Sequence, residues 1–128
     1  MNGTLQEALR RATRAARPLA LRSAGKDRSN TAIVVHAGRR SGRTYRTPVV
    51  AARDQDGFVI ALPYGERTDW AKNVLARGSA SLIAGGQTYE VDRPEVVPLA
   101  DVSSSFRPKE QRLQKRFRVA TALRVHLA

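Results

Sequence analysis

The chain contains no cysteine among its 128 residues. This absence excludes disulfide bonds, thiol catalysis and metal sites built on thiolates. Only two histidines are present, His36 and His126, and they lie far apart in the sequence without an acidic cluster nearby. Zinc and iron sites need several such ligands close together, so we expect no bound metal.

Long hydrophobic runs are also absent, because no stretch of about 18 apolar residues occurs in the sequence. We therefore expect no helix that crosses a membrane and place the chain in the cytoplasm. The first 28 residues predict a basic amphipathic helix, which Pro18 should end or kink. Such a helix would also allow peripheral contact with the inner face of an anionic membrane.

Acidic and aromatic residues are scarce. The chain has 11 Asp and Glu against 23 Lys and Arg, which gives a net charge of +12, and aromatic residues make up 5%. This charge favours anionic partners such as nucleic acid, a membrane surface or a phosphorylated cofactor. A genome that prefers Arg codons would produce the same charge. The few aromatic residues do not interleave with a basic stripe, so a nucleic-acid-binding module is kept only as a rival and no nucleic acid is expected as a partner.

Apolar patterning beyond the first segment predicts an α+β fold in one domain, residues 1–128. The predicted strands cover residues 32–37, 45–53, 58–62, 79–84, 87–97 and 122–127. The predicted helices cover 68–77 and 108–118, with a loop after Pro98. Thr68 or Asp69 should cap the first of these helices, and Gly78 should end it. The last apolar stretch could also continue the preceding helix, although we favour a strand.

Two short turns indicate how the strands pair. The sequence DQDG at 54–57 and the pair Gly85-Gly86 each separate two predicted strands and are typical of hairpins. Hairpins imply antiparallel pairing, and a closed barrel would remove the exposed edges of such a sheet. We therefore expect a small, mainly antiparallel barrel with peripheral helices.

The segment Gly38-Arg39-Arg40-Ser41-Gly42-Arg43 lies between two predicted strands. Two glycines around a hydroxyl allow a tight concave turn whose backbone N–H groups can bind an anion, and arginine can bind phosphate with two parallel hydrogen bonds. The spacing fits neither a P-loop nor a dinucleotide-binding fingerprint. A solvated basic hairpin turn remains the alternative.

Two further features accompany this segment. Pro48 interrupts an apolar strand, which is typical of an edge strand, a bulge or a place where a ligand approaches the backbone. After the next strand come LPYG at 62–65 and a helix whose start carries Trp70 and Asn73 on one face. A helix start favours anions, although a single tryptophan on a helix face is also common in a core.

Taken together, these features resemble the deazaflavin-dependent nitroreductase family. The resemblance rests on the succession VVHAGRRSGRTYRTPVV, then LPYG, then TDWAKNVLARG, over residues 33–97. It implies a split β-barrel of the kind found in flavin-binding oxidases. It also implies coenzyme F420, an 8-hydroxy-5-deazaflavin, as hydride carrier. The phosphate and polyglutamate tail of that coenzyme would account for the basic charge.

The resemblance also implies a set of coenzyme contacts. The turn would hold the phosphate of the side arm, the following strand and the exit of the next strand would flank the ring, and the helix start would close the site. The residues at these positions are Arg39, Arg40, Ser41 and Gly42, then Tyr45, Arg46, Thr47, Pro48 and Val49, then Ala61, Leu62, Pro63 and Tyr64, and finally Asp69, Trp70 and Asn73.

Three positions depart from the family pattern. Ala37 stands where relatives often carry Thr, and Tyr64 stands where some carry Lys. Some relatives have Arg at the position of Tyr45, whereas here Arg46 follows it. A shift of one residue turns a side chain to the other face of a strand.

The implied activity is the transfer of a hydride from reduced F420 to a small organic acceptor such as a quinone, an enone or a nitro compound. The coenzyme supplies the reactivity, so few catalytic side chains are needed. We expect Tyr64 as the proton donor, with Tyr45 second, and a homodimer is compatible with the fold. The rivals are an FMN- or haem-binding split-barrel protein, a nucleic-acid-binding module and a non-catalytic F420 carrier.

Overall fold

The structure is a computed structural model and describes residues 31–128. The basic helix predicted within residues 1–28 lies outside the described residues. No helix of the described part is long and apolar enough to pass through a bilayer.

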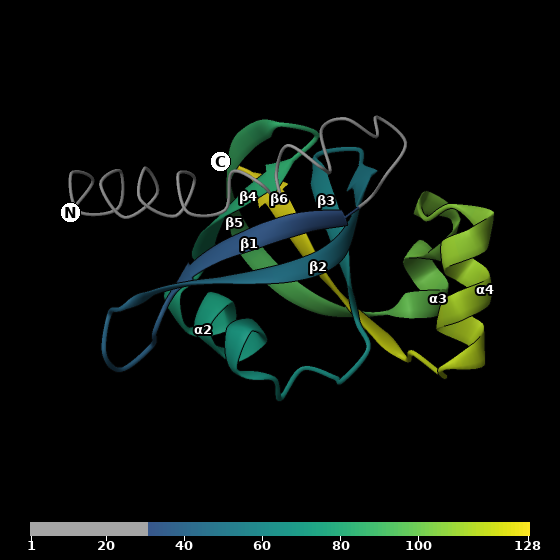
Figure 1. Ribbon diagram of the computed structural model, residues 1–128, viewed down its shortest axis with the longest axis horizontal. Coiled ribbons are helices and arrows are strands. Elements are labelled where there is room, and N and C mark those ends of the chain that lie inside the picture. Colours follow the sequence, from purple (N-terminus) through teal and green to yellow (C-terminus); the bar gives the residue numbers. More distant parts are fainter. Residues whose placement is uncertain (1–30) are drawn as a thin grey trace.

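Six antiparallel strands close into a barrel (Figure 1). They are β1 (Thr31–Ala37), β2 (Thr44–Asp54), β3 (Gly57–Leu62), β4 (Ser79–Ala84), β5 (Gln87–Pro98) and β6 (Thr121–Leu127). Their order around the barrel is β1-β2-β3-β6-β5-β4, and every neighbouring pair is antiparallel. The expected antiparallel barrel is confirmed, and the last apolar stretch is a strand that closes it.

Both predicted hairpins are present. Asp54 pairs with Gly57, so two residues connect β2 to β3. Ala84 pairs with Gln87, and the intervening Gly85 and Gly86 have φ values of 56° and 78°. Positive φ at both central residues is the requirement of the hairpin turn that matches the twist of the flanking strands, and glycine adopts it without steric cost.

The core has two parts that share β3. Inside the barrel, Phe58, Ile60 and Leu62 belong to a cluster of buried residues from all six strands and one helix. Val59 and Ala61 point the other way and pack with Leu99 and other residues of the following helical segment. Because both faces of β3 are covered, all of its residues are buried. This explains why the strand is a continuous apolar run and not an alternating one.

Within residues 31–128, three short helices and one 3-10 turn flank the barrel (Figure 1). They are α2 (Asp69–Arg77), α3 (Leu99–Val102), η1 (Ser103–Ser105) and α4 (Pro108–Arg116). Helix α2 lies along one side of the barrel, and α3 and α4 lie together at one end. The prediction of a loop after Pro98 was wrong, because α3 and η1 form there. Leu99, Val102 and Phe106 are spaced so that one face of this segment is buried against the barrel.

The ends of the helices differ partly from expectation. Thr68 is the N-cap residue of α2, but its hydroxyl donates to the carbonyl of Gly65 at 3.3 Å and makes no hydrogen bond to the helix. Gly78 ends α2 with φ of 73°, as predicted. Helix α4 ends at Arg116, two residues earlier than expected. Its N-cap amide, on Arg107, donates to the carboxylate of Glu110 at 3.0 Å.

Candidate functional site

Two adjoining cavities lie along β2, between the α2 side of the barrel and α4. The first has a volume of about 700 Å³ and mostly apolar walls. The second has a volume of about 530 Å³ and is lined by the turn between β1 and β2. Thr47 and Trp70 line both cavities, so the two form one continuous site.

The apolar cavity exists because β2 and β3 separate. Pairing with β3 begins only at Ala51, whereas β2 pairs with β1 from Thr44 to Val50. This first half of β2 therefore has a strand on one side only, and the cavity lies on the other. Pro48 is in this half, opposite Ile33 of β1. Pro48 therefore has no strand partner on the cavity side, which agrees both with a local strand edge and with a place where a ligand approaches the backbone.

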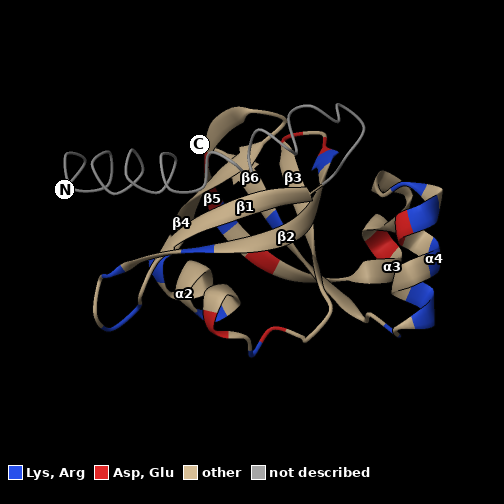
Figure 2. Ribbon diagram, in the orientation of Figure 1, with Lys and Arg blue, Asp and Glu red and all other residues tan. Residues whose placement is uncertain are grey.

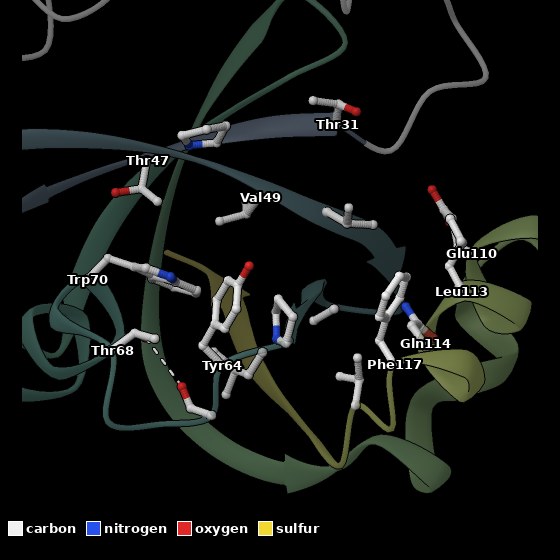
Figure 3. Close-up of a pocket in the computed structure, with 17 residues that line it drawn as sticks. Thr31, Thr47, Val49, Tyr64, Thr68, Trp70, Glu110, Leu113, Gln114 and Phe117 are labelled. Carbon is white, nitrogen blue, oxygen red and sulfur yellow. Dashed lines mark hydrogen bonds between the residues drawn. The ribbon is translucent and has the colours of Figure 1, made fainter.

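Aromatic rings and α4 complete the apolar cavity (Figure 3). Trp70 borders one end, Phe117 and Gln114 of the α4 side border the other, and Tyr64 projects between them. Tyr64 and Phe117 are 87% and 68% exposed, although large apolar side chains on a small domain are normally covered. The other two exposed large hydrophobic residues of the described part, Tyr45 and Leu113, also line these cavities.

The basic cavity is built on a compact turn. The amide of Gly38 donates to the carbonyl of Arg43 at 2.7 Å, and the amide of Gly42 donates back to Gly38 at 2.9 Å. A Cβ on Gly38 would lie 2.6 Å from the Ser41 hydroxyl, so a larger residue would require Ser41 to rotate and to give up the hydrogen bond from the Arg43 amide. Gly42 has φ of 72° and shapes the turn without lining the cavity. Figure 2 shows that Lys and Arg gather along this turn and again along α4.

Helix α2 holds this turn in place. The side-chain oxygen of Asn73 accepts hydrogen bonds from the amide of Arg39 at 3.0 Å and from its guanidinium at 2.8 Å. The guanidinium of Arg39 also lies 3.6 Å from Asp69. Arg77, one turn further along α2, donates to the carbonyl of Gly38 at 2.7 Å. The turn therefore presents its remaining arginines from a fixed backbone.

A buried histidine connects α2 to β2. His36 is only 5% exposed, and its Nδ1 lies 3.1 Å from the Asn73 Nδ2 while its Nε2 lies 3.0 Å from the Thr47 hydroxyl. The ring stacks on Tyr45 with 5.8 Å between centroids. Burial lowers the pKa of His36 from 6.5 to about 4, because the charged form would lose its hydration. His36 is therefore neutral near pH 7.

The predicted contact residues gather around the two cavities. Those that line the basic cavity are Arg39, Arg40, Ser41, Tyr45, Arg46, Thr47, Asp69, Trp70 and Asn73. Those that line the apolar cavity are Thr47, Pro48, Val49, Ala61, Leu62, Pro63, Tyr64 and Trp70. Gly42 is the exception. Tyr45 and Arg46 both reach the basic cavity although they are neighbours on one strand. The two candidate proton donors, Tyr45 and Tyr64, lie in different cavities.

Sequence reasoning missed His36 and the whole contribution of α4. His36 precedes the turn by two residues and was considered only as a metal ligand. The described residues contain no group of His, Asp or Glu side chains that could hold a metal ion. On the α4 side, Leu113 and Phe117 are four residues apart in the sequence, which places them on one face of a helix, and this spacing was the available signal.

The walls suit a ligand with a planar apolar part and an anionic arm. Guanidinium groups and a hydroxyl surround the basic cavity, which is the donor set that phosphate requires. The apolar cavity has flat aromatic walls, and Gln114 at its far end is buried. Its side-chain oxygen has no hydrogen-bond partner within residues 31–128. Buried amides without partners are rare in folded proteins and often mark a place where a ligand or water supplies the missing bond.

The low pKa of His36 makes a prediction about stability. The unfolded chain takes up a proton on this histidine as the pH falls through 6.5, whereas the folded chain does so only near pH 4. The unfolded state therefore binds more protons in this window, and the free energy of unfolding should fall between pH 7 and pH 4 by about 2 to 3 kcal/mol from this residue. Urea denaturation between pH 7 and pH 4 should show a smaller decrease in the free energy of unfolding for His36→Gln than for the unaltered chain.

His126→Gln is the matched control, since it removes the other histidine, which is partly exposed on β6. It should leave the dependence on pH in place. Equal pH dependence in His36→Gln and the unaltered chain would contradict the assignment of this effect to His36.

Comparisons with known proteins identify the family of this chain. The family model described as F420H(2)-dependent quinone reductase matches residues 8–120. No curated protein sequence matches the chain.

Several solved structures share the fold. A protein of unknown function from Agrobacterium tumefaciens is 17% identical, with a TM-score of 0.57 over 77% of this chain and 48% of its own. This chain thus spans about half of that protein's length. The haem storage protein HutZ from Vibrio cholerae is 11% identical, with a TM-score of 0.57 over 87% and 89% of the two chains. An F420-H2 dependent reductase, FDR-A, is also 11% identical, with a TM-score of 0.51 over 73% and 92%.

At these identities the structures establish the split-barrel fold alone. The family model supports a stronger conclusion than the solved structures, because it extends over most of the chain and includes the turn, β2 and α2. It confirms the deazaflavin-dependent reductase expected from the sequence motifs. The chain belongs to the F420H(2)-dependent quinone reductase family, and this membership implies an oxidoreductase that passes a hydride from F420H2 to acceptors such as quinones.

Proposed function

We propose that the two cavities bind F420H2 and its acceptor together, with the anionic side arm in the basic cavity and the ring and acceptor in the apolar one. The observation that carries this proposal is the continuity of the two cavities through Thr47 and Trp70. A coenzyme with a planar ring at one end and a phosphate at the other needs such a pair of neighbouring environments. A single domain, residues 1–128, would be sufficient for both tasks.

The turn between β1 and β2 supplies the proposed phosphate contacts. Arg40 and Ser41 line the basic cavity, and no side-chain hydrogen bond to another described residue occupies the Arg40 guanidinium. Arg39 is already held by Asn73 and Asp69, so we assign it to shaping the site and to a shared contact. Arg46 adds positive charge at the rim.

The apolar cavity supplies the proposed ring site. Pro48 and Val49 form one wall, Leu62 and Pro63 form another, and Trp70 closes the end nearest the basic cavity. When bound, F420H2 supplies the hydride, and the protein's part is to exclude water and to hold the acceptor against the ring. Mostly apolar walls serve both purposes, since they favour flat aromatic molecules over water.

Reduction of a quinone to a hydroquinone by a hydride also needs one proton. Tyr64 is our proposed donor, because it projects into the apolar cavity and its high exposure lets the hydroxyl exchange protons with water. Tyr45 is the second candidate, but it lines the basic cavity and stacks on His36. A cytoplasmic location with peripheral membrane contact, and a homodimer, remain proposals that rest on the sequence.

The first test is coenzyme affinity. Arg40→Ala should weaken binding of oxidised F420 by about tenfold to a hundredfold, the range expected for loss of a hydrogen bond to a charged group. Quenching of Trp70, the one tryptophan, reports binding. Arg43→Ala is the matched control, since it removes the same charge from the same turn and Arg43 lines neither cavity. Tighter binding of FMN than of F420 would contradict the proposal.

The second test concerns proton donation. Tyr64→Phe should lower kcat for quinone reduction by about tenfold or more, in the range typical of a general acid, while the Kd for F420 stays the same. Tyr89→Phe provides the control, because the hydroxyl of Tyr89 bonds to Gln87 and lines neither cavity. Unchanged turnover would remove Tyr64 from the mechanism and direct attention to Tyr45→Phe.

The third test concerns the acceptor. If the amide of Gln114 hydrogen-bonds the oxygen of a quinone at the far end of the cavity, Gln114→Leu should raise KM by about five- to tenfold with little effect on F420 affinity. The same change should stabilise the free protein by about 1 kcal/mol, because it removes a buried amide oxygen that has no partner within the described residues. Gln111→Leu on the same helix serves as control. Unchanged KM would show that the acceptor does not reach Gln114.

A further inference from the structure

Four side chains form a continuous hydrogen-bonded chain from the basic turn to the junction of the cavities. Arg39 bonds to Asn73, Asn73 to His36, and His36 to Thr47. These residues come from the turn, α2, β1 and β2, so the hydrogen bonds link four separate segments of the fold. Its last member, Thr47, is one of the two residues that line both cavities.

The direction of each hydrogen bond in this chain can be determined. Both groups of Arg39 that face Asn73 are donors, at 3.0 Å and 2.8 Å, so the atom between them must be the amide oxygen. The Asn73 nitrogen therefore faces His36 Nδ1, and an amide nitrogen can only donate. Nδ1 consequently carries no proton. In the neutral ring the proton is then on Nε2, which donates to Thr47 Oγ1 at 3.0 Å.

This order leaves one hydrogen unassigned. The Thr47 oxygen accepts from His36, so its own hydrogen is free to donate elsewhere. Within residues 31–128, the Thr47 hydroxyl makes no hydrogen bond other than the one it accepts from His36. Figure 3 shows Thr47 next to Trp70 at the end of the apolar cavity that meets the basic one.

We propose that His36 is a positioning residue, which commits the Thr47 hydroxyl to donating a hydrogen bond to an acceptor atom of the coenzyme where its ring meets its side arm. This inference rests on the proposed function. A threonine without such a neighbour could either donate or accept. Here the arginine at the far end of the chain selects the donor role, because it fixes the orientation of the Asn73 amide and thereby the tautomer of the histidine.

The arrangement also explains why a histidine is buried at this point. His36 is neutral, stacked on Tyr45 and bonded at both nitrogens, so its ring cannot rotate without breaking two hydrogen bonds. A buried polar side chain whose hydrogen-bonding atoms all have partners, as both ring nitrogens of His36 do, is held rigidly. Rigidity at the junction would hold the Thr47 hydroxyl at one angle while the coenzyme enters.

The first experiment measures the tautomer directly, without coenzyme. Long-range proton–nitrogen NMR correlations on labelled protein should show His36 protonated at Nε2 and unprotonated at Nδ1 between pH 7 and pH 9, with His126→Gln used for assignment. In Asn73→Asp at pH 9, the carboxylate can only accept, so the proton should move to Nδ1. A proton on Nδ1 in the unaltered chain would overturn the inference.

The second experiment measures the affinity for oxidised F420 by Trp70 quenching. Thr47→Val should weaken binding by about five- to tenfold, the effect of one lost hydrogen bond, and Thr47→Ser should restore it to within about twofold. Thr44→Val is the matched control, since Thr44 is exposed on the same strand and lines neither cavity. Unchanged affinity in Thr47→Val would overturn the inference.

A double-mutant cycle then separates positioning from a purely structural role. His36→Phe should weaken F420 binding when Thr47 is present and have little further effect in Thr47→Val, because both changes remove the same interaction. Equal losses in both backgrounds would mean that His36 acts only through the fold. If the unaltered chain bound no F420, the proposed function and the Thr47 contact would both be contradicted, whereas the NMR result would still test the His36 tautomer.

Discussion

The amide of Asn73 is the contact on which the rest of the site depends. Its oxygen holds the basic turn through Arg39, and its nitrogen faces His36, so one side chain joins α2 to β1 and to the turn that follows β1. Asn73 is 5% exposed, and a buried amide is costly unless its donors and acceptors are used. Here the oxygen takes two bonds, which makes the orientation of the amide unambiguous and the turn rigid.

The barrel makes that contact possible. Helix α2 packs on the barrel through Ala71 and Val74, which belong to the interior cluster, and this fixes Asn73 on the adjacent face of the helix. The left-handed Gly78 then lets the chain enter β4 at once, so α2 cannot slide along the sheet. On the other side, β2 leaves β3 at Ala51 and opens the apolar cavity. One fold thus produces a charged and an apolar environment next to each other without burying a free charge.

Much of this arrangement could be predicted from the sequence because it depends on local chemistry. The glycines at 85 and 86 determine a hairpin whatever surrounds them, and the glycines of the basic turn do the same. The α4 wall could not be predicted in this way. Leu113 and Phe117 form no apolar stripe of their own within a strongly basic helix, and their position across from Tyr64 depends on how the chain after Pro98 packs. Helix α3 was missed for the same reason, since a helix of four residues has no periodic pattern of its own and depends on the packing of Leu99 and Val102 against the barrel.

His36 shows a different limit of sequence reasoning. The absence of acidic neighbours around His36 in the sequence argued against a metal site. It gave no information about the hydrogen bonds of the imidazole ring. Its role follows from partners 11 and 37 residues away, which meet only when β1 pairs with β2 and α2 packs beneath them. Arg39 can only donate, so it fixes the direction of every later hydrogen bond in this series as far as Thr47. The orientation set at the proposed phosphate site is thereby passed to the proposed ring site. A coenzyme that fills both would therefore meet a donor whose direction was set before binding, which reduces the ordering required when it binds.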